Sequence, residues 1–133
     1  PRQRPEMAIH KFMRIIEEGG VIPMFGDGST GRDYTYIDDI VDGVVRTVEN
    51  LNGYNVYNLG GDKVVYLKEL IETIGEVVGK EPNIERLPMQ PGDVPATYAD
   101  TQIASERLGF SPQTRIKEGL PAFVNWYREY HRI

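Results

Sequence analysis

Residues 26–43, GDGSTGRDYTYIDDIVDG, constrain the fold more than any other stretch, because two ligand-binding signatures follow one another there. Gly26, Gly28 and Gly31 form G-x-G-x-x-G. This spacing holds a dinucleotide only where a strand ends at the first glycine and a helix begins near the third. The next residues, RDYTYI, instead favour a strand over residues 32–37. The glycines therefore predict a hairpin or a turn, of which the hairpin is favoured, and we expect no dinucleotide at this position.

The second signature, D-D-x-x-D, is formed by Asp38, Asp39 and Asp42. Such acids chelate a Mg²⁺-diphosphate when they line an all-helical cavity opposite a second acidic cluster, and this chain has one copy and no all-helical pattern. We interpret the acids as features of a helix: Asp38 or Asp39 caps it, and both favour its positive end. Asp42 can pair with Arg46 one turn later. We therefore predict no metal site.

Hydrophobic periodicity predicts a chain in which helices and short strands alternate, as in a mixed α/β unit. A proline-rich loop, residues 88–97, interrupts the pattern, and no internal repeat is present. Helices are predicted over residues 5–18, 37–52, 67–78, 101–108 (capped by Thr101) and 116–127, and strands over residues 21–25, 32–37, 55–60 and 83–87.

Composition excludes several classes of protein. The 133 residues fit one globular domain, and the absence of cysteine excludes disulfides, thiol nucleophiles and cysteine zinc sites. A net charge of −5 without a basic stripe argues against nucleic acid, and no apolar run approaches the roughly 20 residues of a membrane span. We expect a cytoplasmic protein. The first residues, PRQRPEM, have neither an initiator methionine nor a polar leader and indicate the middle of a longer protein.

Catalytic constellations are sparse. His10 and His131 are far apart in the sequence, and for each a structural or surface role is favoured. The serines lack the strand–turn–helix setting of a nucleophile. We therefore expect no self-sufficient active site in this chain.

Three segments together resemble one family: RPEMAIHKF, GDGSTGRDYTYIDDIVDGV and PMQPGDVPATYAD. They are similar to the C-terminal part of the NAD-dependent nucleotide-sugar epimerases and dehydratases, which are extended short-chain dehydrogenases. The resemblance runs in order along essentially the whole chain, including NVYNLGG and VNWYREYH. It is closest to the UDP-glucuronate 4-epimerases, with the UDP-glucose 4-epimerases as near relatives.

The resemblance implies an α/β fold of mixed helices and short strands, the substrate-side portion of the enzyme without most of the Rossmann sheet. Residues 1–133 would form a single C-terminal nucleotide-sugar-binding domain of a longer parent enzyme. Residues 55–60 would be a strand that completes the Rossmann sheet of that parent. The family's NAD loop and catalytic Tyr-x-x-x-Lys lie in an N-terminal Rossmann region. None of the eight tyrosines here precedes a lysine by four residues. We expect no catalytic residue, no bound cofactor and no turnover from this chain alone.

In the parent enzyme, the resemblance implies conversion of UDP-glucuronate to UDP-galacturonate, an isomerase reaction that uses NAD. This portion would hold UDP while the sugar turns over. A UDP-glucose 4-epimerase or a sugar-nucleotide dehydratase as the parent stays open, as does a non-catalytic nucleotide-sugar-binding module. The implied partners are the UDP-sugar, the N-terminal Rossmann region and, because the family commonly forms homodimers through helices of that region, a second copy.

The first and third residues of the R-D-Y motif, Arg32 and Tyr34, are the expected nucleotide contacts. Arg32 matches a family arginine that reaches the diphosphate, a task that suits a planar guanidinium with paired donors. The alternative is a surface pair of Arg32 with its neighbour Asp33. Tyr34 matches a contact near the ribose, and a packed aromatic ring is its alternative.

The proline-rich loop carries a second group of candidates. Pro91 and Gly92 suit the two central positions of a type II turn that presents Asp93. A carboxylate can accept hydrogen bonds from both hydroxyls of a ribose, as the matching family residue does, and completion of the turn is the alternative. Gln90 stands where UDP-glucose epimerases have an arginine, which favours the glucuronate group.

The remaining candidates come from the first two predicted elements. Pro23, Met24 and Phe25 match the stretch that flanks uracil, where backbone hydrogen bonds and an apolar slot are available. Met7 matches a nucleotide contact. Arg4 matches an arginine that glucuronate epimerases direct towards the sugar carboxylate, with a solvated arginine as the alternative.

Overall fold

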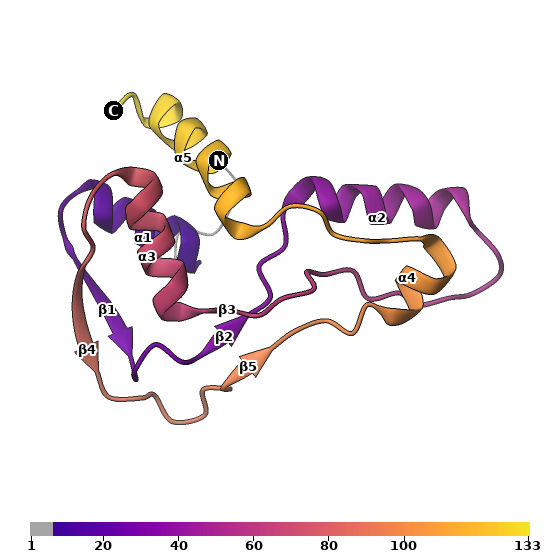
Figure 1. Cartoon of the computed structure of the whole chain (residues 1–133), viewed down its shortest axis with the longest axis horizontal. Helices are drawn as coiled ribbons and strands as arrows, with labels where there is room; N and C mark the ends of the chain where they lie inside the picture. The colour runs from indigo at the N-terminus through magenta and orange to yellow at the C-terminus, as the bar shows by residue number, and fades with distance from the viewer. Residues whose placement is uncertain (1–6) are drawn as a thin grey trace.

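The computed structural model describes residues 7–133 and divides into two parts (Figure 1). The core lobe contains α1, β1, α3, β4 and α5, and the arm consists of residues 37–61 and 98–114 and contains α2 and α4. In chain order the elements are α1 (Ala8–Glu17), β1 (Val21–Phe25), β2 (Gly31–Arg32), α2 (Ile37–Glu49), β3 (Val65–Tyr66), α3 (Leu67–Val78), β4 (Asn83–Leu87), β5 (Ala96–Thr97), α4 (Gln102–Leu108) and α5 (Ile116–His131).

Helix α3 is the centre of the core lobe, because it packs against both α1 and α5. Its residues Leu70, Ile71, Ile74 and Val78 follow the helical period and are all buried. Burying each such side chain contributes about 1.5–3 kcal/mol. The structure confirms the helices predicted from residues 67 and 116, and it confirms the first helix from residue 8 onward; residue 5 lies outside the described residues.

Strands β1 and β4 form a parallel pair whose register runs from Val21 opposite Asn83 to Phe25 opposite Leu87. Alternate residues of β1, Ile22 and Met24, are buried in the core. Among the described residues this sheet has only two strands, so β1 keeps an unpaired edge. That edge explains why a strand can contain Pro23, which lacks a backbone N–H. Both predicted strands are confirmed.

A second sheet joins the core lobe to the arm. Strand β2 lies between β3, which is antiparallel to it, and β5, which is parallel. The strand predicted over residues 32–37 is therefore wrong beyond Arg32. Its neighbours β3 and β5 are only two residues long, so the chain from residue 33 has no ladder to continue and instead enters α2 at Ile37.

The glycine-rich stretch forms a turn between β1 and β2. Gly26 and Gly28 have φ angles of 76° and 85°, and the Asp27 carboxylate accepts a hydrogen bond from the Ser29 amide at 2.9 Å. The prediction of a turn is confirmed. The favoured form of that turn, a hairpin, is wrong, because β1 pairs with β4 and β2 pairs with other strands. A strand follows Gly31, so the helix that a dinucleotide fingerprint requires does not form there.

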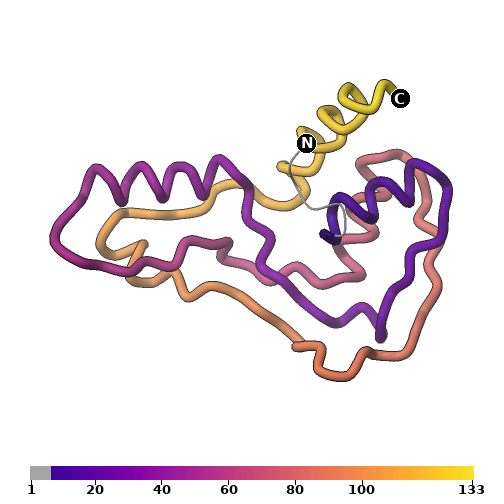
Figure 2. The backbone as a smooth tube through the Cα atoms, turned by 180° about the vertical axis from the view of Figure 1, so that it is seen from behind, coloured from indigo at the N-terminus to yellow at the C-terminus, as the bar shows by residue number. Residues whose placement is uncertain are grey.

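The arm has its own small core. Tyr57 and Leu59 pack against buried residues of α4 and the segment after it. The two stretches of the arm lie side by side in the view from behind (Figure 2). Residues 55–60 form no strand, which corrects the prediction. The described residues offer no strand beside them, and a lone strand cannot satisfy its backbone groups. Most apolar residues of α2 face outward: Ile37, Val41, Val44, Val45 and Val48.

The acidic residues of α2 act differently from the prediction. Its N-cap residue is Tyr36, without a side-chain capping bond, so capping by Asp38 or Asp39 is wrong. The buried Asp39 carboxylate instead accepts hydrogen bonds from the backbone amides of Gln113, at 3.1 Å, and Thr114, at 2.9 Å. It therefore ties α2 to the segment that enters α5. The predicted pair of Asp42 with Arg46 is confirmed at 2.6 Å.

Thr101 is at the N-cap position of α4, as predicted, but its side chain makes no capping hydrogen bond. The carboxylate of Asp100 accepts a hydrogen bond from the amide of Gln102 at 3.1 Å instead. The short helix ends at Gly109, in agreement with the prediction.

Glu17 connects the ends of the three helices of the core lobe. Its side chain is only 10% exposed and accepts hydrogen bonds from Lys80 at 2.7 Å and Arg128 at 2.5 Å. Burial raises the pKa of Glu17, but the bonds from Lys80 and Arg128 outweigh it and hold the pKa below its ordinary value. The ionised form is therefore the one that the folded state stabilises.

We predict that Glu17→Gln lowers the free energy of unfolding by about 1–2 kcal/mol at neutral pH, because one charge-assisted hydrogen bond loses its acceptor and the other loses its negative partner. Since folding lowers the pKa of Glu17, its contribution is complete above the ordinary glutamate pKa of about 4.3 and is lost as the pH falls further. Urea denaturation at several pH values measures both effects. Glu72→Gln is the control, because Glu72 forms an exposed pair with Lys68 at 3.8 Å; an equal loss there would contradict the prediction.

Candidate functional site

Arg32 and Asp93, which are 61 positions apart in the sequence, meet in the structure. The Nη2 atom of Arg32 lies 3.1 Å from Oδ1 of Asp93, and Nη1 donates to the carbonyl of Val94 at 3.0 Å. Both charged side chains are 34% exposed, so water reaches the pair. The structure thus brings together the residues predicted for the diphosphate and the ribose. The alternative pairing of Arg32 with Asp33 is not the contact that forms.

The proline-rich loop places Asp93 through a turn. The amide of Asp93 donates to the carbonyl of Gln90 at 3.3 Å, and Gly92 has a φ angle of 84° at the third position. This geometry agrees with the predicted type II turn, which favours glycine at that position. Gln90 itself is exposed beside the turn.

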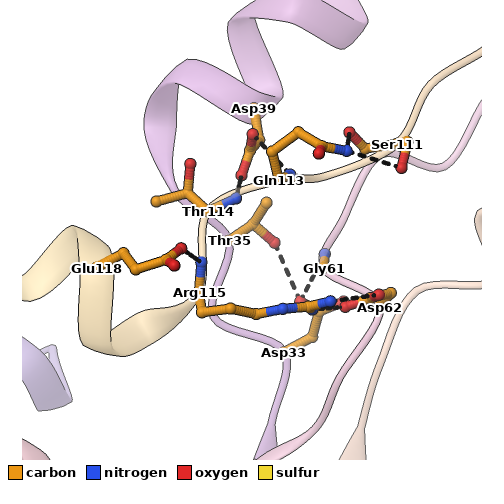
Figure 3. Close-up of polar contacts among 10 residues, drawn as sticks. All are labelled: Asp33, Thr35, Asp39, Gly61, Asp62, Ser111, Gln113, Thr114, Arg115 and Glu118. Atoms are coloured by element: carbon orange, nitrogen blue, oxygen red, sulfur yellow. Dashed lines mark hydrogen bonds and ion pairs between the residues drawn. The ribbon is translucent and has the colours of Figure 1, made fainter.

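Asp33 is a residue whose importance the sequence reasoning missed. Its Oδ1 atom accepts hydrogen bonds from the amide of Gly61 at 2.7 Å and the hydroxyl of Thr35 at 3.0 Å (Figure 3). Its Oδ2 atom accepts one from the amide of Ala99 at 3.2 Å. The adjacent glycines at 60 and 61, which allow a close approach to a carboxylate, were the available signal.

Tyr34 is half-buried against the core rather than beside Arg32 on a strand, since β2 ends at Arg32. Burial raises the pKa of the Tyr34 hydroxyl, and the positive charge of Arg32 opposes that shift. Tyr34 lines two adjoining hollows of about 440 and 370 Å³. Neither Arg32 nor Asp93 lines them. This placement supports the alternative of a packed aromatic ring.

The three residues predicted near uracil alternate in their exposure along β1. Met24 is 1% exposed and packs in the core, so its side chain cannot line a ligand slot and only its backbone is available. Pro23 and Phe25 are half-buried on the other face. The two-residue period of a strand sends neighbouring side chains to opposite faces and so accounts for this alternation.

Two predicted contacts lie at the start of the chain. Met7 is exposed at the N-cap of α1, where its carbonyl accepts a hydrogen bond from Lys11 at 2.9 Å. Arg4 lies outside the described residues. His10, in contrast, has a packing role that agrees with the prediction, because its ring meets Phe123 and Tyr127 edge-on.

Comparison with known proteins identifies this arrangement. Residues 1–60 match the model of the NAD dependent epimerase/dehydratase family. The UDP-glucuronate 4-epimerase of Thermodesulfobacterium geofontis is 40% identical over 130 residues, which are 97% of this chain and 40% of that protein. The chain belongs to the NAD-dependent epimerase/dehydratase family. Its mixed α/β architecture is that of the extended short-chain dehydrogenases, as predicted.

Two solved structures of the epimerase/dehydratase family have the same fold. The UDP-glucuronic acid 4-epimerase of Bacillus cereus, in complex with UDP-glucuronic acid and NAD, aligns with a TM-score of 0.85 at 34% identity, covering 98% of this chain and 42% of that one. The UDP-glucose 4-epimerase of Thermotoga maritima, with UDP-glucose, aligns with a TM-score of 0.84 at 31% identity and covers 98% and 43%.

This family member spans less than half the length of its curated relatives, for example 45% of an Escherichia coli protein and 39% of one from Methanocaldococcus jannaschii. No helix within residues 7–133 combines the length and hydropathy needed to cross a membrane. In the same residues, no group of three or more histidine, aspartate and glutamate side chains is arranged to hold a metal ion.

We predict that Arg32→Ala and Asp93→Ala each change the free energy of unfolding by less than about 1 kcal/mol, because exposed ion pairs contribute little. Asp39→Asn provides the contrast: it should cost about 1–3 kcal/mol, since a partly buried backbone amide loses its acceptor on the buried Asp39 side chain. Thermal or urea unfolding measures all three. Destabilisation by Arg32→Ala as large as that by Asp39→Asn would assign Arg32 a structural role.

Proposed function

We propose that this chain is the nucleotide-sugar-binding domain of an NAD-dependent 4-epimerase that converts UDP-glucuronate to UDP-galacturonate. The observation that carries the proposal is the meeting of Arg32 and Asp93, two residues matched to the diphosphate and ribose contacts of the family, at one exposed place. Relatives that are named as UDP-glucuronate 4-epimerases support the choice of sugar.

In this proposal the chain supplies an anchor for UDP. Arg32 faces the diphosphate with the edge formed by Nε and the second N–H of Nη2, since Nη1 donates to the carbonyls of Gly31 and Val94 and Nη2 donates to Asp93. Asp93 has one oxygen bonded to Arg32, which leaves Oδ2 to accept hydrogen bonds from the ribose hydroxyls. The exposed backbone edge of β1, with Pro23 and Phe25, offers backbone groups and apolar surface for uracil.

NAD supplies hydride transfer when it is bound to an enzyme of this kind. The glycine motif of this chain does not fit that cofactor, because a strand follows Gly31. We therefore propose that the parent's Rossmann region binds NAD and provides the catalytic groups. The role of residues 1–133 is to fix the nucleotide end of the substrate, since a remote anchor lets the sugar turn while UDP stays in place.

The outward face of α2 fits such a parent. Ile37, Val41, Val44, Val45 and Val48 form an exposed apolar surface on one helix. A helix with an exposed apolar side normally covers another layer of the fold. We propose that the Rossmann region covers this face, and that residues 55–60 become a strand when the parent sheet lies beside them.

A stand-alone module that binds nucleotide sugars without chemistry is the second candidate function. It shares the Arg32–Asp93 site with the epimerase and differs in having no catalytic partner. A UDP-glucose 4-epimerase is a related alternative, supported by the Thermotoga maritima structure. Gln90, which replaces the arginine of that group, argues for glucuronate.

We predict that Arg32→Ala and Asp93→Ala, made in the protein that carries this chain, each weaken UDP binding by roughly 1.5–3 kcal/mol, the range for hydrogen bonds to charged groups. Isothermal titration calorimetry measures the dissociation constants. Arg46→Ala is the matched control, because Arg46 also pairs with an aspartate but lies on α2. Unchanged UDP affinity in the first two variants would contradict the proposed site.

We predict that Arg4→Ala, made in the full-length parent enzyme, lowers kcat/KM for UDP-glucuronate by roughly 10-fold or more, about 1.4 kcal/mol, while UDP affinity stays nearly constant. The physical reason is the loss of a charge-assisted bond to the sugar carboxylate. Steady-state assays with UDP-glucuronate and UDP-glucose measure the effect. A wild-type preference for UDP-glucose, or a variant as active on UDP-glucuronate as the wild type, would favour the UDP-glucose alternative.

A further inference from the structure

Asp33 joins three segments that are distant in the sequence, immediately beside Arg32. Its carboxylate accepts hydrogen bonds from Gly61, Thr35 and Ala99, and its own amide donates to the carbonyl of Thr97 at 3.1 Å. Residue 33 is therefore held through its backbone and through both carboxylate oxygens. The segments it joins are the end of β2, the entrance to β3 and the exit from β5.

These contacts involve the segments that carry Arg32 and Asp93. Arg32 is on β2, one residue before Asp33, and Asp93 is on the loop that enters β5. Beyond β5, the bond from Ala99 to Asp33 fixes that strand against β2. We infer that Asp33 is a positioning residue for UDP: it holds the β2 and β5 segments together so that Arg32 and Asp93 face the nucleotide at the correct distance. This inference rests on the proposed function.

The direction in which Asp33→Asn changes UDP affinity distinguishes a positioning role of Asp33 from a purely electrostatic effect of its charge. Asp33 is negative, and it is adjacent in sequence to the proposed diphosphate ligand. If its charge were its only influence, Asp33→Asn would remove repulsion and tighten UDP binding. A positioning role has the opposite sign, because the asparagine NH₂ group cannot accept the hydrogen bond from Gly61 or Ala99.

The chain offers a matched control in Asp39. Asp39 is also a carboxylate that accepts hydrogen bonds from two backbone amides, those of Gln113 and Thr114, through separate oxygens. Its bonds lie on the arm, between α2 and the entrance to α5. Asp33→Asn and Asp39→Asn therefore remove the same charge and the same kind of bond, and they differ in which segments are released.

The experiment compares UDP binding by calorimetry in the protein that carries this chain, for the wild type, Asp33→Asn, Asp39→Asn and Arg32→Ala. We expect Asp33→Asn to raise the UDP dissociation constant by about 5-fold or more and Asp39→Asn by less than about 2-fold. Tighter binding in Asp33→Asn, or equal weakening in both asparagine variants, would overturn the positioning role. If Asp33→Asn has no effect while Arg32→Ala weakens binding, the inference fails and the proposed function stands. If Arg32→Ala has no effect either, both fail.

A charge-neutral variant keeps the test decisive if Asp33→Asn does not fold. A Cβ atom added at Gly61 would collide with the Oδ1 atom of Asp33. Gly61→Ala therefore displaces Asp33 without changing any charge, and we expect it to raise the UDP dissociation constant in the same direction. Gly53→Ala is its control, because it strains a glycine of the arm with a φ angle of 64° while its added Cβ meets no neighbouring atom and leaves Asp33 in place. Unchanged UDP affinity in a folded Gly61→Ala protein would overturn the inference.

Discussion

Hydrogen bonding on both sides of β2 connects the core lobe to the arm. The strand has only two residues, yet β3 pairs with one edge and β5 with the other, and each comes from a different part of the chain. Beyond Arg32 the strand ends, and Asp33 continues the connection: its amide donates to the carbonyl of Thr97, and its carboxylate accepts hydrogen bonds from the amides of Gly61 and Ala99. A strand this short is stable because the elements it joins are already fixed by the core around α3.

The sequence was sufficient for those elements whose signal is local. The apolar periods of α3 and α5, the strands β1 and β4, and the positive-φ turn at Gly26 and Gly28 all depend on neighbouring residues, and all were predicted. The strand predictions that were wrong depend on neighbouring strands from elsewhere in the chain. Residues 55–60 have strand composition but no neighbouring strand, and residues 33–36 adjoin strands that end too soon. Composition cannot show either circumstance.

The candidate site shows the same difference between features that depend on local sequence and features that depend on tertiary contacts. The pattern indicated Arg32 and Asp93 separately, but their contact depends on β2 and β5 becoming neighbours, which the sequence does not state. The role of Asp39 was misjudged because a local rule, helix capping, competed with a tertiary one, and its burial favoured the tertiary bonds. Met24 shows the opposite case, since the alternation of a strand alone assigns its side chain to the core.

An ion pair whose two partners are one-third exposed is weak while water surrounds it. The same groups become stronger ligands once a nucleotide and a covering domain remove that water, because the effective dielectric constant falls. This difference explains why a binding site can have little influence on the stability of the domain that carries it. The rigid part of the anchor is then not the charged pair itself but the neutral hydrogen bonds of β2 and the amides held by Asp33, which exist before any ligand arrives. Preorganisation of this kind lets the charged groups contribute to nucleotide affinity without first paying for the ordering of the loops.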